Sequence, residues 1–159
     1  KGRKIMASAI ELIKQLRERT GAGLNDCKKA LEANGNDLDK ASDWLREQGI
    51  AKSAKKANRI AAEGLADVTV NNNDGVIVEV NCETDFVAKG EKFKKLVSDV
   101  RDVIKNKKPK NVDEANALLQ STFADATVAM GEKLSLRRFE IINKKNKLQN
   151  YCYYQYSCV

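Results

Sequence analysis

Apolar residues in the first third of the chain recur at the spacing of one helix face. The first group fits the i, i+3, i+4, i+7 pattern and consists of Ala9, Leu12, Ile13 and Leu16. Two further groups repeat the pattern: Leu24, Cys27 and Leu31, and then Leu38, Ala41, Ser42 and Leu45. The pattern predicts a three-helix bundle over residues 7–49. So small a bundle has a thin core, which leaves apolar surface for a partner.

Polar and glycine residues mark the expected ends of these helices. Ser8 and Glu11 predict a capping box at the start of the first helix. The predicted stops are Gly21, Asn34-Gly35 and Gly49. Residues 1–6 are expected to be a leader, with Met6 as the native start.

After residue 65 the apolar positions alternate with polar ones, which indicates β-strands. Two alternating groups flank Asn72-Asn73-Asp74-Gly75 and predict a hairpin: Ala66, Val68 and Val70, then Val76, Val78, Val80 and Cys82. Ile77, Glu79 and Asn81 occupy the alternate positions of the second group. Residues 134–142 predict a third strand, in which the adjacent Arg137 and Arg138 indicate a bulge or an edge position.

Helical spacing returns between the second and third predicted strands. One group is closed by Lys107-Lys108-Pro109 and comprises Phe93, Leu96, Val97, Val100 and Ile104. Another precedes a break near Gly131 and comprises Ala115, Leu118, Leu119, Thr122 and Phe123. The fold class is therefore predicted to be α+β, with residues 65–142 forming a three-stranded antiparallel sheet with at least two packed helices.

Two segments fit neither pattern. Residues 50–64 contain a basic, alanine-rich stretch, which predicts either a helical arm or a semi-rigid spacer with a solvated charged face. Residues 143–159 hold all four tyrosines and two of the four cysteines. This composition indicates a divergent tail, a truncated product whose end is read in another frame, or a final edge strand.

The charge distribution restricts the kinds of partner. The net charge is +7, and the first 60 residues carry 14 Lys and Arg against 8 Asp and Glu. The only aromatic residue among them is Trp44, so nucleic-acid binding is not expected. No apolar run approaches the roughly 18 residues of a membrane-spanning helix, so a membrane protein is not expected.

The residue types argue against catalysis. The chain has no histidine, no Gly-rich phosphate loop and no Cys-x-x-Cys pair, so neither a metal site nor a cofactor is expected. Glu83 and Asp85 lie two positions apart and have no neighbouring base or metal-ligand set in the sequence. A binding protein in a reducing cytoplasm is the prediction.

A polar stretch with an aromatic residue follows the second predicted strand. Glu83, Thr84 and Asp85 cannot extend its apolar face, yet Phe86 and Val87 come next. Phe86 is therefore expected on a loop, where an aromatic side chain is either packed into the core or offered to a partner.

The octapeptide Asn81-Cys82-Glu83-Thr84-Asp85-Phe86-Val87-Ala88 resembles the signature of elongation factor Ts, the bacterial and organellar nucleotide-exchange factors for the GTPase elongation factor Tu. Thr20-Gly21-Ala22-Gly23-Leu24-Asn25-Asp26-Cys27-Lys28-Lys29-Ala30-Leu31 is similar to that family's N-terminal module, which resembles ubiquitin-associated domains. The resemblance runs from about Met6 to Phe139 and includes Ala61-Ala62-Glu63-Gly64 and Met130-Gly131-Glu132. The family's second core half is not represented.

This resemblance implies two surfaces for elongation factor Tu. The implied docking positions are Lys14, Arg17, Leu24, Asn25 and Lys28. The implied wedge is Asp85 and Phe86, with Thr84 and Val87 beside them and the turn at Met130 and Gly131 as support. Phe86 would enter an apolar crevice of the GTPase and Asp85 would approach its magnesium site, which loosens GDP. Asn25 departs from the family, which has two apolar residues at positions 24 and 25.

An alternative is an adaptor without exchange activity, in which the three-helix module binds ubiquitin-like or peptide partners, or RNA through Lys52 to Arg59. Release of labelled GDP from elongation factor Tu distinguishes the two hypotheses. Since no transit peptide is visible, a bacterial-type cytoplasm is expected.

Overall fold

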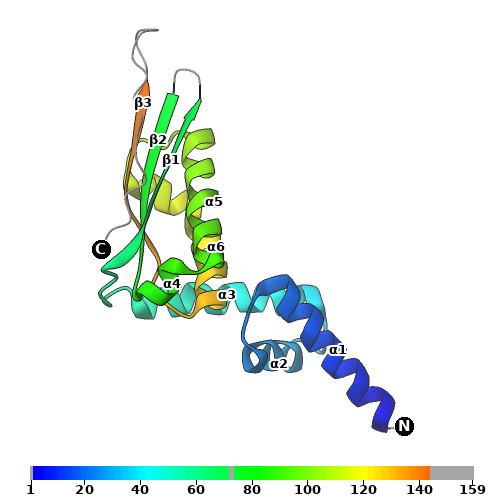
Figure 1. The fold of residues 1–159 in the computed structure, drawn as a ribbon. Coiled ribbons are helices and arrows are strands. Elements are labelled where there is room, and N and C mark those ends of the chain that lie inside the picture. The colour runs from blue at the N-terminus through cyan, green and yellow to red at the C-terminus, as the bar shows by residue number, and fades with distance from the viewer. Residues whose placement is uncertain (1, 72–73, 144–159) are drawn as a thin grey trace. The chain divides into compact units, whose positions relative to one another are not determined.

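The computed structural model describes residues 2–71 and 74–143, with side chains from residue 9 onward (Figure 1). These residues form two compact units: residues up to 57 together with 123–131, and residues 58–122 together with 132 onward. The predicted turn at 72–73 and the predicted tail from 144 lie outside the described residues. No helix in the described part of the chain has the length and apolar character to cross a bilayer.

The first unit contains the three predicted helices together with the end of α6 (Val112–Met130), which was not predicted there. The predicted helices are α1 (Gly2–Thr20), α2 (Leu24–Ala33) and α3 (Leu38–Lys56). The predicted capping box is wrong, because Ser8 lies inside α1, which begins before the predicted leader ends. Asp37 does cap α3, since its carboxylate accepts hydrogen bonds from the backbone N–H groups of Asp39 and Lys40.

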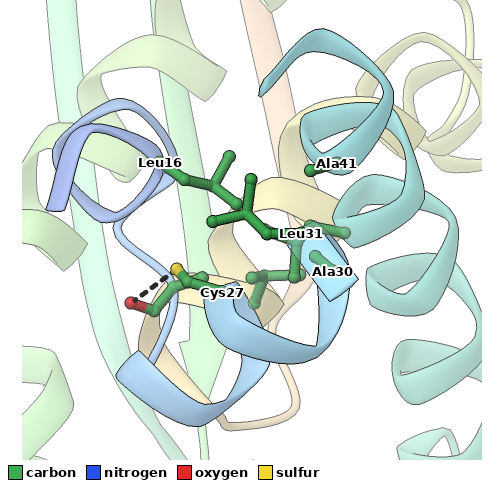
Figure 2. Packing of buried hydrophobic residues seen from close by; sticks show 8 residues of the cluster. Leu16, Cys27, Ala30, Leu31 and Ala41 are labelled. Carbon is green, nitrogen blue, oxygen red and sulfur yellow. Dashed lines mark hydrogen bonds between the residues drawn. The ribbon is translucent and has the colours of Figure 1, made fainter. Parts of the chain in front are cut away.

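Small and branched apolar side chains from all three helices form the core of this unit (Figure 2). Leu16 of α1 lies among them with no exposed surface, and the thiol of Cys27 donates to the carbonyl of Ala22. The buried members are Leu16, Ala22, Cys27, Ala30, Leu31, Ala41, Leu45 and Val128. The apolar spacing predicts Leu24 on the buried face of the second helix, but its side chain is 58% exposed because it lies at the start of α2, before the first buried residue at Cys27.

The predicted end of the third helix at Gly49 is wrong, because α3 continues to Lys56. Gly49 is buried, and a β-carbon there would lie 2.5 Å from the carbonyl oxygen of Ala124. This glycine therefore permits close packing of α3 on the end of α6 instead of stopping the helix. Beyond it, residues 50–56 continue α3 as a helical arm, in which Lys52 pairs with Asp26 of α2 at 2.9 Å.

The second unit is built on an antiparallel sheet with the order β1-β2-β3. The strands are β1 (Glu63–Asn71), β2 (Asp74–Cys82) and β3 (Ser135–Asn143), and the helices are α4 (Asp85–Lys89), α5 (Glu91–Lys107) and α6 (Val112–Met130), whose end belongs to the first unit. The hairpin pairs Glu63 with Cys82. Helix α5 packs on β1 and β2 (Figure 1). All five residues of its predicted apolar face are buried, as expected. On α6, by contrast, Leu118 is exposed.

The predicted irregularity in the third strand is confirmed. The register between β2 and β3 shifts after the pair of Glu79 with Arg138, so that Val80 pairs with Leu136 and Arg137 is the extra residue. Both arginines donate to the Glu79 carboxylate, at 3.2 and 2.6 Å. Glu79 is buried beneath these two arginine partners, because β2 is the central strand of the sheet.

Asn81 is the second buried polar residue on β2. Its amide nitrogen donates to the backbone carbonyl of Glu63, at 3.0 Å, across the β1–β2 pair. Gly64 lies opposite, and a β-carbon there would collide with the carbonyl oxygen of Val80. The start of β1 is thus held tightly against the end of β2, directly before the segment that carries Phe86.

Candidate functional site: an exposed phenylalanine on a clamped helix

The segment after β2 is a short helix and not the predicted loop. Thr84 is the N-cap of α4, and its hydroxyl accepts a hydrogen bond from the backbone N–H of Val87 at 3.3 Å. Gly90 ends α4 and at once precedes α5. The polar residues that cannot continue the strand therefore start a helix, because threonine is a favourable cap.

Phe86 lies on this helix with 85% of its surface exposed. The interpretation of Phe86 as a core residue is therefore wrong. Ala88 is the one buried residue of α4, Val87 is half-buried, and Asp85 is exposed. The helix contacts α5, β1 and β2.

Two carboxylates cross between the start of α4 and the residues after α6. The Glu132 carboxylate accepts from the backbone N–H groups of Glu83 and Thr84, at 3.0 and 3.1 Å, and from the Thr84 hydroxyl at 2.6 Å. In return the Glu83 carboxylate accepts from the backbone N–H of Lys133 at 2.6 Å. We call these four residues, 83, 84, 132 and 133, the crossed clamp. Charge-assisted bonds of this kind are stronger than neutral ones and fix the direction in which α4 leaves the sheet.

Asp85 carries a charge that is balanced in the free protein. Its carboxylate lies 2.8 Å from the ammonium of Lys89, one turn along α4. The hydrogen bond from Lys89 lowers the pKa of Asp85, and the reverse contact raises the pKa of Lys89. Asp85 is thus ionised at neutral pH. It has to break its contact with Lys89 before it can pair with another cation.

The predicted supporting turn at Met130 and Gly131 directly precedes Glu132 in the sequence. Met130 ends α6 and Gly131 has a positive φ of 75°, which favours glycine. Both belong to the first unit, whereas Glu132, the next residue, belongs to the second and joins the crossed clamp.

The five docking positions lie on the first unit, and all are exposed: Lys14, Arg17, Leu24, Asn25 and Lys28. Lys14 and Arg17 are three positions apart on α1, so they share one face. Leu24 and Lys28 are four apart on α2 and share another. The two helices meet through the buried core beneath.

Comparison with known families covers both units. Residues 1–54 match the family model described as "Elongation factor Ts, mitochondrial, N-terminal", and residues 83–157 match the model described as "Elongation factor TS". The chain belongs to the elongation factor Ts family. The first match includes the exposed docking positions, and the second contains α4 and the crossed clamp. The second match also extends beyond Phe139, where the resemblance seen in the sequence ended.

The family motifs contain residues to which the sequence assigned no role. Glu83 and Glu132 lie in two of these motifs, yet nothing in either motif shows that each carboxylate accepts a hydrogen bond from the backbone at or next to the other glutamate. The pairs are separated by 48 to 50 positions along the chain. A glutamate within each motif was the available signal, and only the fold brings the two segments into contact.

Replacing Glu132 with alanine is expected to destabilise the second unit by about 1–3 kcal/mol, since two backbone N–H groups lose a charged acceptor. Urea unfolding of the variant measures this loss. Glu140, an exposed carboxylate on β3, provides the matched control: Glu140→Ala is expected to change stability by less than about 0.5 kcal/mol. Equal stability of the two variants would show that the crossed clamp contributes nothing to the fold.

The buried thiol beneath α4 is expected to react slowly. Burial, followed by the negative charge of Glu132, raises the pKa of Cys82 from 9.0 to about 11. At pH 8 the folded protein therefore holds Cys82 as a thiol, and we expect it to be alkylated at least about tenfold more slowly than in urea. Peptide mapping after iodoacetamide treatment measures this ratio, and rapid labelling of Cys82 in the folded protein would contradict it.

The same thiol predicts the sign of a pH effect. Because the folded pKa is the higher one, the unfolded chain loses this proton first as the pH rises. The contribution of Cys82 to stability is therefore complete below about pH 9 and declines between about pH 9 and 11.

Proposed function

We propose that this protein promotes release of GDP from elongation factor Tu, and that it acts by binding rather than by catalysis. The observation that carries the proposal is Phe86, a large aromatic side chain that is 85% exposed on a helix tied down by the crossed clamp. Membership of the elongation factor Ts family supports the identity of the partner. The protein needs no cofactor of its own for this activity.

Thermodynamic linkage describes what such a protein must do. If it lowers the affinity of the GTPase for GDP by some factor, then GDP lowers the affinity of the GTPase for the protein by the same factor. The protein therefore has to make contacts with the nucleotide-free GTPase that the GDP-bound form does not offer. Phe86 is proposed to supply them by entering an apolar crevice that opens only in the nucleotide-free form.

The magnitude of the Phe86 contact is sufficient for a large effect. Burying a side chain of this size contributes about 1.5–3 kcal/mol, which corresponds to roughly a 10- to 150-fold change in an equilibrium constant. The cost of ordering Phe86 is partly met in the free protein, because α4 is already formed and held. Asp85 is proposed to give up Lys89 and to place its charge near the magnesium site.

The first unit is proposed to dock the protein on the GTPase. Its exposed positions Lys14, Arg17 and Lys28 are cationic, whereas Leu24 offers apolar surface. Charges of this type mainly raise the rate of encounter, and the apolar residue raises the lifetime of the complex. Asn25 replaces an apolar residue of the family, so this surface is expected to bind more weakly than a fully apolar pair at these positions.

The direct experiment is GDP release. Elongation factor Tu is loaded with fluorescent GDP, an excess of unlabelled GDP is added, and the fluorescence decay is followed with and without the protein. Acceleration that increases with protein concentration and saturates supports the proposal. Binding without acceleration would instead favour the adaptor hypothesis.

The compartment follows from the partner. Elongation factor Tu acts in translation, so we propose either a bacterial-type cytoplasm, as expected from the sequence, or the mitochondrion, which the description of the matching N-terminal model names.

A further inference from the structure

One apolar residue near the crossed clamp has no role in the fold. Ile60 lies in the connection between α3 and β1, and its side chain is 85% exposed, as much as that of Phe86. Single exposed apolar residues are common on protein surfaces and need no explanation by themselves. What distinguishes Ile60 is how its backbone is held.

The residue before Ile60 is connected to the crossed clamp twice. The guanidinium of Arg59 lies 3.2 Å from the Glu83 carboxylate. The ammonium of Lys133 donates to the backbone carbonyl of Arg59 at 2.8 Å, while the backbone N–H of Lys133 donates to Glu83. Lys133 thus bridges the connection and the start of α4, and Ile60 is fixed at a set position beside this bridge.

The spacing allows one partner to contact both exposed side chains. Phe86 is three residues after Glu83, at most about 11 Å along the chain, and Ile60 is adjacent to Arg59, about 3.8 Å between α-carbons. A typical interface covers about 800 Å² on each partner, which is about 32 Å across when circular. The Arg59–Glu83 contact lies between these two steps, so a footprint of this size can include both Ile60 and Phe86 when it is centred on that contact.

The charges around Ile60 favour an apolar contact. Arg59 is already paired with Glu83, and the two residues after Ile60 are alanines. A partner that covers Ile60 meets the Arg59–Glu83 pair, which the protein itself neutralises, and the Lys133 ammonium, which already donates to the carbonyl of Arg59. This arrangement fits an apolar patch on a protein.

We propose that Ile60 is a second apolar contact for the GTPase that receives Phe86, held in place by the Arg59–Glu83–Lys133 bridge. The inference rests on the proposed function and extends it. Because Ile60 is an apolar contact outside the wedge, it is expected to contribute to affinity in both nucleotide states of the GTPase. Its loss therefore raises the protein concentration needed for half-maximal GDP release, and it leaves the maximal release rate unchanged.

The test compares Ile60 with Val70, an apolar residue of β1 that is 61% exposed. Val70 is seven residues beyond the start of β1 at Glu63, and so lies about 23 Å along the strand from the end that follows Ile60. GDP release from elongation factor Tu is titrated with the unsubstituted protein, Ile60→Ala, Ile60→Asp, Val70→Ala and Val70→Asp. Thermal unfolding of each variant is measured in parallel.

We expect Ile60→Asp to raise the half-maximal concentration at least about tenfold and Ile60→Ala about threefold or more, with both Val70 variants within about twofold of the unsubstituted protein. The shift for Ile60→Ala is expected to persist at 0.5 M salt, because an apolar contact is not screened. Ile60 variants that match their Val70 counterparts, or that shift the titration only because they unfold, would overturn the inference and leave the proposed function intact. Failure of the unsubstituted protein to release GDP would overturn both.

Discussion

Phe86→Ala is expected to lower the maximal rate of GDP release from elongation factor Tu by about 10- to 100-fold, while the protein stays folded. The expected loss corresponds to the apolar contact of about 1.5–3 kcal/mol that Phe86 makes only in the nucleotide-free complex. Since the side chain is 85% exposed in the free protein, its removal leaves no cavity. Stopped-flow fluorescence at saturating protein measures the rate, and thermal unfolding measures the fold.

The melting temperature of Phe86→Ala is expected to lie within about 3 °C of the unsubstituted protein, as for other substitutions of exposed residues. Leu118→Ala provides the control, because Leu118 is also an exposed apolar residue of the second unit, on α6. This variant is expected to retain the full release rate. An unchanged rate for Phe86→Ala, or a lower rate that its loss of folding accounts for, would remove Phe86 from the mechanism.

Leu16→Ala is expected to cause the largest loss of stability among the substitutions considered. Leu16 is fully buried among residues of all three helices of the first unit, and truncation of such a leucine costs about 2–5 kcal/mol. A unit of this size has a total stability of only several kcal/mol. We therefore expect its melting temperature to fall by roughly 10 °C or more.

The fluorescence of Trp44 follows this unit selectively, because it is the only tryptophan in the chain and packs against the core that contains Leu16. Ile10→Ala is the matched control on the same helix, since Ile10 is 68% exposed, and it is expected to unfold with the unsubstituted protein. The release assay is repeated at a temperature above the melting point of the first unit in Leu16→Ala. Under this condition, we expect the variant to need a higher protein concentration for half-maximal GDP release. Retention of the normal titration with an unfolded first unit would show that this unit does not dock the protein.

Elements with a long and regular apolar period could be predicted from the sequence alone. The apolar face of α5 has five positions that pack against one surface, and the apolar set on β2 has four buried positions, so each prediction rests on several residues. The bulge at Arg137 was also visible, because two adjacent charged residues cannot both follow the alternation.

Other features depend on contacts between distant parts of the chain. A glycine at the position of Gly49 is typical of a helix end. Only the close packing of Ala124 against it explains why a glycine stands inside a helix that continues. The burial of Glu79 requires two arginines that arrive from β3.

For the candidate site, the sequence identified Phe86 but left its burial open. An aromatic residue after a strand has the same local sequence whether it packs inward or faces solvent. The fold places it on α4, outside the sheet, and the Glu132 carboxylate that holds this helix comes from 48 residues further along the chain than its Thr84 partner. Neither the position of Phe86 on α4 nor the contact from Glu132 produces a periodic pattern in the sequence.

The central claim is that Phe86 makes a contact that only the nucleotide-free GTPase offers. Its most direct test is the affinity of the protein for elongation factor Tu in the nucleotide-free and GDP-bound forms, measured by calorimetry for the unsubstituted protein and for Phe86→Ala. The account predicts that the unsubstituted protein binds the nucleotide-free form more tightly, and that Phe86→Ala reduces this preference by about 10-fold or more. Equal affinity of the unsubstituted protein for the two forms, or a preference that Phe86→Ala leaves intact, would contradict it.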